Sequence, residues 1–247
     1  MAAVECIGVI PARFASTRFP GKPLALIGGK PMIQWVYEGA RKARSLQRVL
    51  VATDDERIAE AVRSFGGESM LTSAEHACGT DRLAEVAGRA PNAGILVNIQ
   101  GDEPLIRPES IDLAVRRLVD VQDAGMSTLV AACPPEDWDN PNVVKVVLDS
   151  RGMALYFSRA PIPYERTKFE GFAALKHIGL YAYKRDFLLK FAAAAPTPLE
   201  QKEGLEQLRA LEMGWPIACA HSPYDSIGVD TPEDIERVLA ALETGQR

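Results

Sequence analysis

The stretch CIGVIPARFASTRFPGKPL, residues 6–24, begins as an apolar strand and ends as a loop rich in cations. Its first five residues are apolar or glycine, which is typical of a buried strand. Arg13, Arg18 and Lys22 then follow in a segment interrupted by prolines and a glycine. Because ligands of open α/β sheets bind beyond the carboxyl ends of the strands, the stretch predicts an anion-binding loop after the first strand of an α/β fold.

Short apolar runs alternate with amphipathic helical patterns through the first half of the chain. We expect strands at residues 6–10, 48–53 and 94–100, and helices at residues 31–44, 54–67, 80–90 and 108–121. This alternation predicts a Rossmann-like, mostly parallel but mixed central sheet with helices on both faces.

The second half has a different pattern. Runs with strand composition follow one another without a long helix between them, at residues 127–133, 142–148, 153–160 and 174–183. They predict a smaller antiparallel β subregion over residues 127–183, with a projecting hairpin, inside a single domain spanning residues 1–247.

The C-terminal part of the chain alternates between helical and strand patterns. We expect helices at residues 199–214 and 231–243 around a short strand at residues 216–220, and Thr231 with Asp234 resembles a capping box.

The overall composition is that of an ordinary globular chain with an acidic balance. The 247 residues are 47% hydrophobic and 25% charged, with a net charge of -5, which argues against a general nucleic-acid binder. The four cysteines form no C-x-x-C pair, so neither a zinc site nor a disulfide framework is expected. No apolar run approaches the roughly 20 residues of a membrane span, and the N-terminus has the pattern of a strand rather than a signal peptide. We therefore expect a cytoplasmic protein with no membrane partner.

The loop after the first strand suits a phosphate ligand. Its polar residues are Arg13, Ser16, Thr17, Arg18 and Lys22. Arginine holds phosphate oxygens bidentately, and lysine supplies a point charge. The loop is not a Walker A motif, because Ser16 stands at the first glycine position and Pro23 follows the lysine. The alternative is a solvated basic turn, but the position directly after a strand favours phosphate binding.

Two acidic segments could provide a counterpart to this loop. The run VNIQGDEP ends a buried strand with Asp102, and GVDTPED places Asp230 before a helix. Carboxylates in such places hold Mg²⁺ against a phosphate, although a Gly-Asp turn and a helix cap are the structural alternatives. Together with the cationic loop they indicate metal-assisted phosphoryl or nucleotidyl transfer.

A set of segments runs along nearly the whole chain, from about Ile7 to Leu242: IPARFASTRFPGKPL, ATDD, GTDRLAE, VNIQGDEP, NPNVVKVVLD, LYFSRAPIPYER, KHIGLYAY, LEQLR and GVDTPED. Together they resemble the 3-deoxy-D-manno-octulosonate (Kdo) cytidylyltransferases, or CMP-Kdo synthetases, within the sugar nucleotidyltransferases. The resemblance implies an enzyme that transfers the cytidylyl group of CTP to Kdo, releasing pyrophosphate and forming CMP-Kdo for lipopolysaccharide. The sugar hydroxyl would attack the α-phosphate in line, assisted by Mg²⁺ as the cofactor.

The resemblance also implies residue roles. Arg13 and Lys22 would neutralise the triphosphate, and Asp102 and Asp230 would hold the metal, so these four form the expected catalytic set. The expected CTP site comprises Ala12, Arg13, Ser16, Thr17, Arg18, Lys22, Asp54, Gly79, Thr80 and Arg82. The expected acceptor-sugar site comprises Gln100, Arg159, Arg166, His177, Tyr181, Glu206 and Gln207.

Several alternatives stay open at this point. Arg159 suits a structural ion pair, Tyr181 a core position and His177 a satisfied imidazole, while Glu206 and Gln207 would suit a solvent-facing helix. The acceptor is Kdo or a related acid sugar such as 8-amino-Kdo or a sialic acid, and a non-enzymatic alternative is a nucleotide-binding regulator. In the family, hairpins like the one after IPYER help to form a dimer, so we expect a homodimer. Cys78 beside Gly79 departs from the small hydroxyl residue that would fit there easily, and we expect its thiol to be inert.

Overall fold

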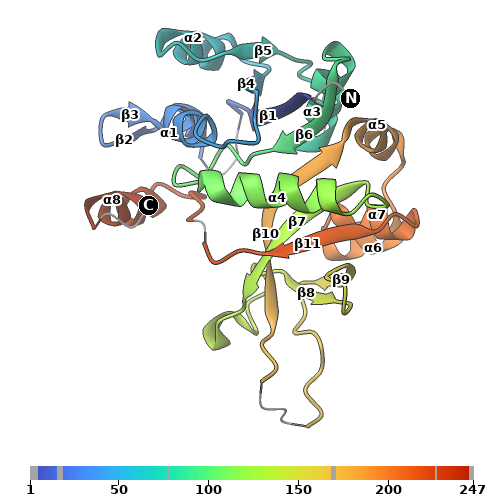
Figure 1. Ribbon diagram of the computed structural model, residues 1–247. Coiled ribbons are helices and arrows are strands. Elements are labelled where there is room, and N and C mark those ends of the chain that lie inside the picture. Colours follow the sequence, from blue (N-terminus) through green and yellow to red (C-terminus); the bar gives the residue numbers. More distant parts are fainter. Residues whose placement is uncertain (1–4, 16–18, 77, 168–170, 226, 245–247) are drawn as a thin grey trace.

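A nine-stranded mixed sheet forms the centre of the computed structural model, which describes residues 5–15, 19–76, 78–167, 171–225 and 227–244 (Figure 1). The strands are β1 (Glu5–Ala12), β4 (Arg48–Thr53), β5 (Ser69–Leu71), β6 (Ala93–Asn98), β7 (Met126–Ala132), β8 (Lys145–Leu148), β9 (Ala154–Ser158), β10 (Leu175–Lys184) and β11 (Ile217–His221). A separate two-stranded sheet pairs β2 (Leu26–Ile27) with β3 (Lys30–Pro31).

Helices lie around this sheet. They are α1 (Met32–Ala40), α2 (Glu56–Ser64), α3 (Gly79–Arg89), α4 (Pro108–Asp120), α5 (Arg185–Ala193), α6 (Pro198–Glu203), α7 (Gln207–Glu212) and α8 (Asp234–Glu243), with short 3₁₀ helices η1 (Lys22–Leu24) and η2 (Pro135–Asp137). None of these helices combines the length and the apolar character that crossing a bilayer requires.

The strand order is β11-β7-β10-β6-β1-β4-β5. The strands β6, β1, β4 and β5 run parallel to one another, as do β11 and β7, whereas β10, which lies between the two groups, is antiparallel to both β6 and β7. The prediction of a mostly parallel but mixed sheet is therefore confirmed. In the parallel part, Ala12 pairs with Thr53 and Val9 with Asn98, so β1, β4 and β6 all end at the same edge.

Side chains along each strand point alternately to the two faces of the sheet, and each face packs against its own hydrophobic core. On β1, Ile10 faces the core shared with α1, α2 and α4, whereas Ile7 and Val9 face the core shared with α3 and α5. Successive side chains of a strand point to opposite faces, so apolar residues at consecutive positions bury both faces. The expected helices on both faces are confirmed.

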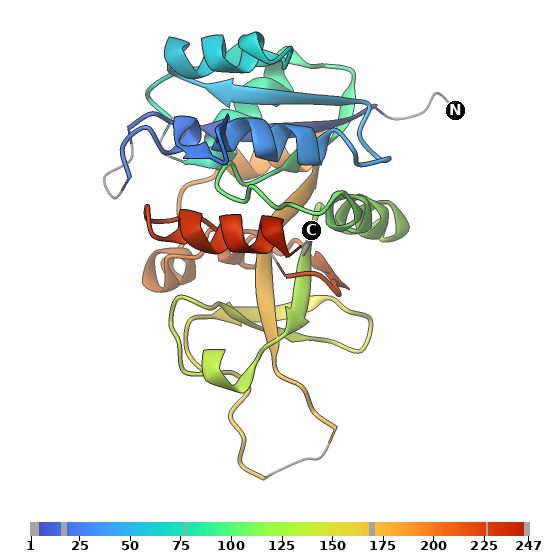
Figure 2. The same cartoon turned by 90° about the vertical axis from the view of Figure 1, so that its left-hand side faces the viewer.

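The region after Ser127 contributes to the same sheet and also extends beyond it. β8 pairs antiparallel with β9 and with the first part of β10. The loop between β9 and β10 projects past both strands, at the end of β10 opposite α5 (Figures 1 and 2).

One helix prediction in the C-terminal half was wrong, and a second was confirmed except for its first turn. Residues 199–214 form two short helices rather than one, because Gly204 ends α6 in the left-handed conformation, with φ at 63°. The expected helix at residues 231–243 begins at Asp234, since a turn of i to i−3 hydrogen bonds comes first. The Asp234 carboxylate still accepts the backbone N–H of Thr231, so the expected capping contact is present one turn early.

One helix has no counterpart in the sequence prediction. α5 follows β10 directly, and Phe187, Leu188 and Phe191 bury its inner side. No side chain caps its first turn, so the sequence offers no start signal between the strand and the helix.

Candidate active site

The loop after β1 leaves the sheet at the shared edge of the parallel strands. Arg13 follows the strand, and its Nη2 donates to the carbonyl oxygen of His76 at 2.5 Å. Gly21, in the left-handed region at φ 71°, donates its N–H to the carbonyl of Phe14 at 2.9 Å and so closes the loop before Lys22. Three of the expected phosphate-binding residues, Ser16, Thr17 and Arg18, lie outside the described residues.

Lys22, Asp102 and Asp230 come together although they are far apart in sequence. The Nζ of Lys22 lies 2.7 Å from Oδ2 of Asp102, and 3.7 Å from Oδ1 of Asp230. It also donates to the carbonyl of Val229 at 2.9 Å. Three of the four expected catalytic residues therefore share one point at the carboxyl edge of the sheet.

The backbone holds this point in place. A Cβ at Gly101 would lie 2.8 Å from the carbonyl oxygen of Pro11, so the absence of a side chain lets the β6–α4 loop touch the end of β1. The N–H of Val229 donates to the carbonyl of Asp102 at 2.9 Å. The segment before α8 is thereby tied directly to the loop after β6.

The donor set at this point fits a hard divalent cation. The groups around the Lys22 ammonium are two carboxylates and a carbonyl, all oxygen ligands, and the ammonium shows that a cation is accommodated there. Within the described part of the chain no group of three or more His, Cys, Asp or Glu could hold a metal. Mg²⁺ is commonly bound by one or two carboxylates with substrate phosphates completing its shell, so two carboxylates are sufficient for it.

The start of α3 forms a second wall beside the β1 loop. The first turn of α3 lies against Pro11 at Gly79. A Cβ added to Gly79 would be 3.7 Å from the ring of Pro11. Arg82 is fully buried and donates through Nη1 to Thr72, and through Nη2 to Asp54 at 3.1 Å. The expected CTP residues Asp54 and Arg82 are thus brought together, with both guanidinium contacts directed into the protein.

Glu206 links this wall to the far side of the site. Its two carboxylate oxygens accept hydrogen bonds from Thr80 Oγ1 at 2.6 Å and from Cys78 Sγ at 3.1 Å, and Arg209 lies 3.3 Å away. Burial and then the Glu206 charge raise the pKa of the Cys78 thiol to about 12. That shift agrees with the expectation of an inert thiol. Glu206 therefore does not simply face solvent, and its neighbour Gln207 is buried as well.

Gln100, His177 and Tyr181 meet where β10 changes register. Gln100 donates to the carbonyl of Gly179 at 2.8 Å, and the rings of His177 and Tyr181 have centroids 5.3 Å apart. His177 Nε2 lies 2.9 Å from Thr128 Oγ1, and burial lowers the pKa of His177 to about 4. The imidazole is therefore neutral at neutral pH, and burial also raises the pKa of Tyr181.

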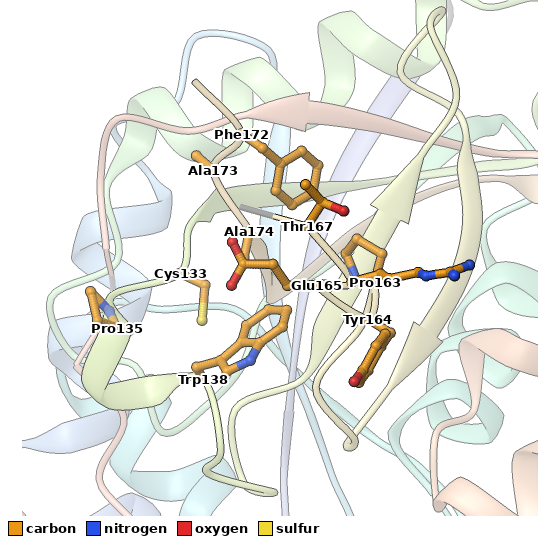
Figure 3. A pocket seen from close by; sticks show the side chains of 11 residues that line it. Cys133, Pro135, Trp138, Pro163, Tyr164, Glu165, Thr167, Phe172, Ala173 and Ala174 are labelled. Atoms are coloured by element: carbon orange, nitrogen blue, oxygen red, sulfur yellow. The ribbon is translucent and has the colours of Figure 1, made fainter. Parts of the chain in front are cut away.

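The two expected sugar-side arginines stand apart from this group. Arg159 directs its guanidinium to the carbonyls of Glu203 at 2.7 Å and Pro141 at 2.9 Å, which is a structural set of contacts. Arg166 is exposed in the loop between β9 and β10 and lines a cavity of about 710 Å³. Figure 3 shows this cavity between Trp138 and side chains of the loop such as Phe172.

Asn98 is a further candidate that the sequence reasoning missed. It ends β6, is 6% exposed and pairs with Tyr181 across the sheet. Its Nδ2 lies 3.9 Å from where a Cβ of Gly79 would be, and its buried Oδ1 has no hydrogen-bond partner among the described residues. A buried acceptor left in this state is the kind that a ligand donor satisfies. The sequence did contain a signal for this residue, because Asn98 is the one polar side chain inside the apolar run ILVNI.

Several known proteins are similar to this chain over nearly its whole length. The sequence model of the family described as cytidylyltransferase matches residues 7–221. A 3-deoxy-manno-octulosonate cytidylyltransferase from Geobacter sulfurreducens is 55% identical over 246 residues, covering 95% of this chain and 98% of the relative. The protein of the same name from Solibacter usitatus is 55% identical over 235 residues, covering 95% and 93%.

Solved structures show the same relationship. The structure of CMP:2-keto-3-deoxy-manno-octonic acid synthetase complexed with CTP superposes with a TM-score of 0.93 at 43% identity, over 98% of this chain and 99% of that one. A cytidylyltransferase from Leptospira borgpetersenii, at 19% identity, covers 97% of this chain and 87% of that one with a TM-score of 0.66, and so shares the fold. Since the family match and the high identities extend over nearly the whole chain, the protein belongs to the cytidylyltransferase family, among its 3-deoxy-manno-octulosonate cytidylyltransferases.

Proposed function

We propose that this protein transfers the cytidylyl group of CTP to 3-deoxy-D-manno-octulosonate, forming CMP-Kdo and pyrophosphate for lipopolysaccharide biosynthesis. The observation that carries the proposal is the meeting of Lys22, Asp102 and Asp230 at the carboxyl edge of the sheet. A cation and two carboxylates at one point are the groups that metal-assisted nucleotidyl transfer requires. The relatives at 55% identity carry the name of this activity.

In this mechanism, Arg13 and Lys22 neutralise the charge of the triphosphate and of the departing pyrophosphate. Asp102 and Asp230 would hold Mg²⁺, which supplies Lewis-acid polarisation of the α-phosphate. Gly79 and Thr80, in the first turn of α3, and buried Asn98 lie on the nucleotide side of the site. No covalent intermediate with the enzyme is required, because positioning and electrostatic stabilisation suffice for an in-line displacement.

The acceptor would lie against Gln100, His177, Tyr181 and Glu206. His177 is neutral, so it contributes orientation and hydrogen bonding rather than charge. Glu206 is fixed by Thr80 and Cys78 and presents a charged edge suited to sugar hydroxyls. Arg159 keeps the adjoining backbone in place through the carbonyls that it contacts.

The test is pyrophosphate release by the purified protein with Mg²⁺, Kdo and each of CTP, UTP, ATP and GTP. We expect release with CTP and Kdo together and with no other nucleotide. Release with CTP and 8-amino-Kdo or a sialic acid, but not with Kdo, would keep the reaction and change the acceptor. CTP binding without release from any pair would contradict the proposal and favour a nucleotide-binding regulator.

We also propose a homodimer that uses the loop between β9 and β10. The support is the exposure of aromatic side chains on this loop, where Tyr164 is 87% and Phe172 is 56% exposed. Both line the cavity that Trp138 also lines. Large exposed apolar side chains gathered on one projecting segment are typical of a protein–protein contact.

A further inference from the structure

The Lys22 ammonium lies between the two carboxylates, Asp102 and Asp230, that would hold the metal. It is 2.7 Å from one carboxylate, 3.7 Å from the other and 2.9 Å from the carbonyl of Val229. The side chain of Lys22 is only 17% exposed, so the charge is largely shielded from water. A monovalent and a divalent cation repel each other strongly at such short range, so the ammonium and the metal cannot share this place.

We propose that Lys22 is an internal counter-ion, which holds the metal position in the nucleotide-free protein and moves to the triphosphate when the nucleotide binds. This inference rests on the proposed function for the identity of the nucleotide and the metal. Its consequence is that the free protein binds divalent cations weakly. The triphosphate strengthens their binding by drawing Lys22 away, and by linkage the metal strengthens nucleotide binding by the same factor.

The chemistry of lysine suits this exchange. Its ammonium is a compact charge with rotatable donors on a flexible four-carbon stem. The stem begins at η1, directly after the left-handed Gly21 that closes the phosphate-binding loop. Lys22 therefore starts from the segment expected to surround the triphosphate, and a change of side-chain rotamers redirects its charge without moving the sheet.

The backbone segments that carry the two carboxylates are joined by contacts that do not involve Lys22. The N–H of Val229 donates to the carbonyl of Asp102, and Gly101 packs against Pro11. Removing the ammonium would thus keep this backbone framework and take one positive charge away from the two carboxylates that it carries. Like charges held close together favour uptake of a cation, and here that cation is divalent.

The experiment measures binding of Mn²⁺ alone, without nucleotide or acceptor, by electron paramagnetic resonance of free Mn²⁺. We expect Lys22→Met to bind Mn²⁺ at least tenfold more tightly than the unmodified protein. Lys22→Gln, which keeps a hydrogen-bond donor but no charge, should show the same direction. Equal or weaker binding by both variants would overturn the inference.

Two further variants place the effect at this site. Lys22→Met combined with Asp102→Asn should lose the gain. Lys30→Met removes a lysine paired with Glu38 and should bind Mn²⁺ like the unmodified protein. A gain that survives in the double variant, or that Lys30→Met reproduces, would contradict the inference.

The measurement uses no turnover, so it separates this inference from the proposed function. A gain in Mn²⁺ affinity together with no pyrophosphate release from any substrate pair would keep the counter-ion and refute the assigned reaction. Normal pyrophosphate release without a gain in Mn²⁺ affinity would keep the assigned reaction and refute the counter-ion.

Discussion

Lys22 meets Asp102 across 80 residues of chain and Val229 across 207. Lys22, Asp102 and Asp230 each have an ordinary local alternative, which is a basic turn, a Gly-Asp turn and a helix cap respectively. The spacing along the chain says nothing about their approach, because the contact depends on how the strands order themselves. At the residue scale the sequence predicted the chemical types and the fold brought them together.

Asp102→Ala should lower turnover by about 100-fold or more, in line with the loss of one key electrostatic group in an active site. The carboxylate is 35% exposed and at a loop, so the variant should keep its thermal stability within about 1 kcal/mol. Pyrophosphate release at saturating Mg²⁺ and a thermal melt check both parts. Near-normal turnover would refute the metal-binding role.

His177 should make the stability of the fold depend on pH. Burial lowers the pKa of His177 from its ordinary value of 6.5 to about 4 in the folded protein. Between these values the unfolded chain takes up a proton that the folded one excludes, so stability falls as pH decreases from 6.5 to about 4. His177→Gln should lose less stability over this window in urea titrations, and an identical decline in both proteins would contradict the expectation.

Among the helices and strands, the sequence predicted most elements. It did not predict the boundaries that lack a start or stop signal. The apolar run of β1 was readable because a strand buried on both faces is apolar at consecutive positions, and the apolar faces of α2 to α4 were readable because burial on one side imposes a period of 3.6 residues. α5 was missed because its apolar residues continue directly from β10. The break at Gly204 was missed because a glycine inside a helical pattern is read as a weak helix position until its φ is known.

The contact between α3 and the segment before α7 gives a prediction at this scale. Thr80 is 1% exposed and donates to Glu206. Thr80→Val should therefore cost about 1–3 kcal/mol of stability by leaving a partly buried carboxylate oxygen without this donor, and should raise KM for the acceptor. Thr80→Ser keeps the hydroxyl and should recover most of both. Chemical denaturation and steady-state kinetics measure the effects, and failure of the serine to rescue would assign them to packing.

At the scale of the whole molecule, the antiparallel β10 joins the two halves of the site. It pairs with β6, which ends near Asp102, and it carries His177 and Tyr181 toward β7 and β8. β11, parallel to β7, returns the chain so that the segment before α8 reaches the loop after β6. The nucleotide and acceptor sides are therefore built on one continuous sheet.

The proposed homodimer can be tested on the loop between β9 and β10. Tyr164→Ser with Phe172→Ser should shift the mass measured by light scattering after size exclusion from two chains to one at low micromolar concentration. Leu71→Ser, which changes a 47% exposed residue on the edge strand β5, is the matched control and should keep the mass of two chains. A single-chain mass for the unmodified protein would contradict the proposal.

The sequence by itself determined the α/β class, most elements, the cationic loop after the first strand and the family resemblance, because these are local patterns of burial period, turn residues and contiguous motifs. Only the tertiary structure decided which candidates meet. It placed Lys22 between two carboxylates, turned Glu206 toward Thr80 and Cys78, and exposed the missed Asn98 as a buried amide with an unpaired oxygen among the described residues. The physical reason is that such contacts are non-local: they follow from strand order, from the antiparallel insertion of β10 and from close backbone approach at Gly101, none of which one segment encodes alone.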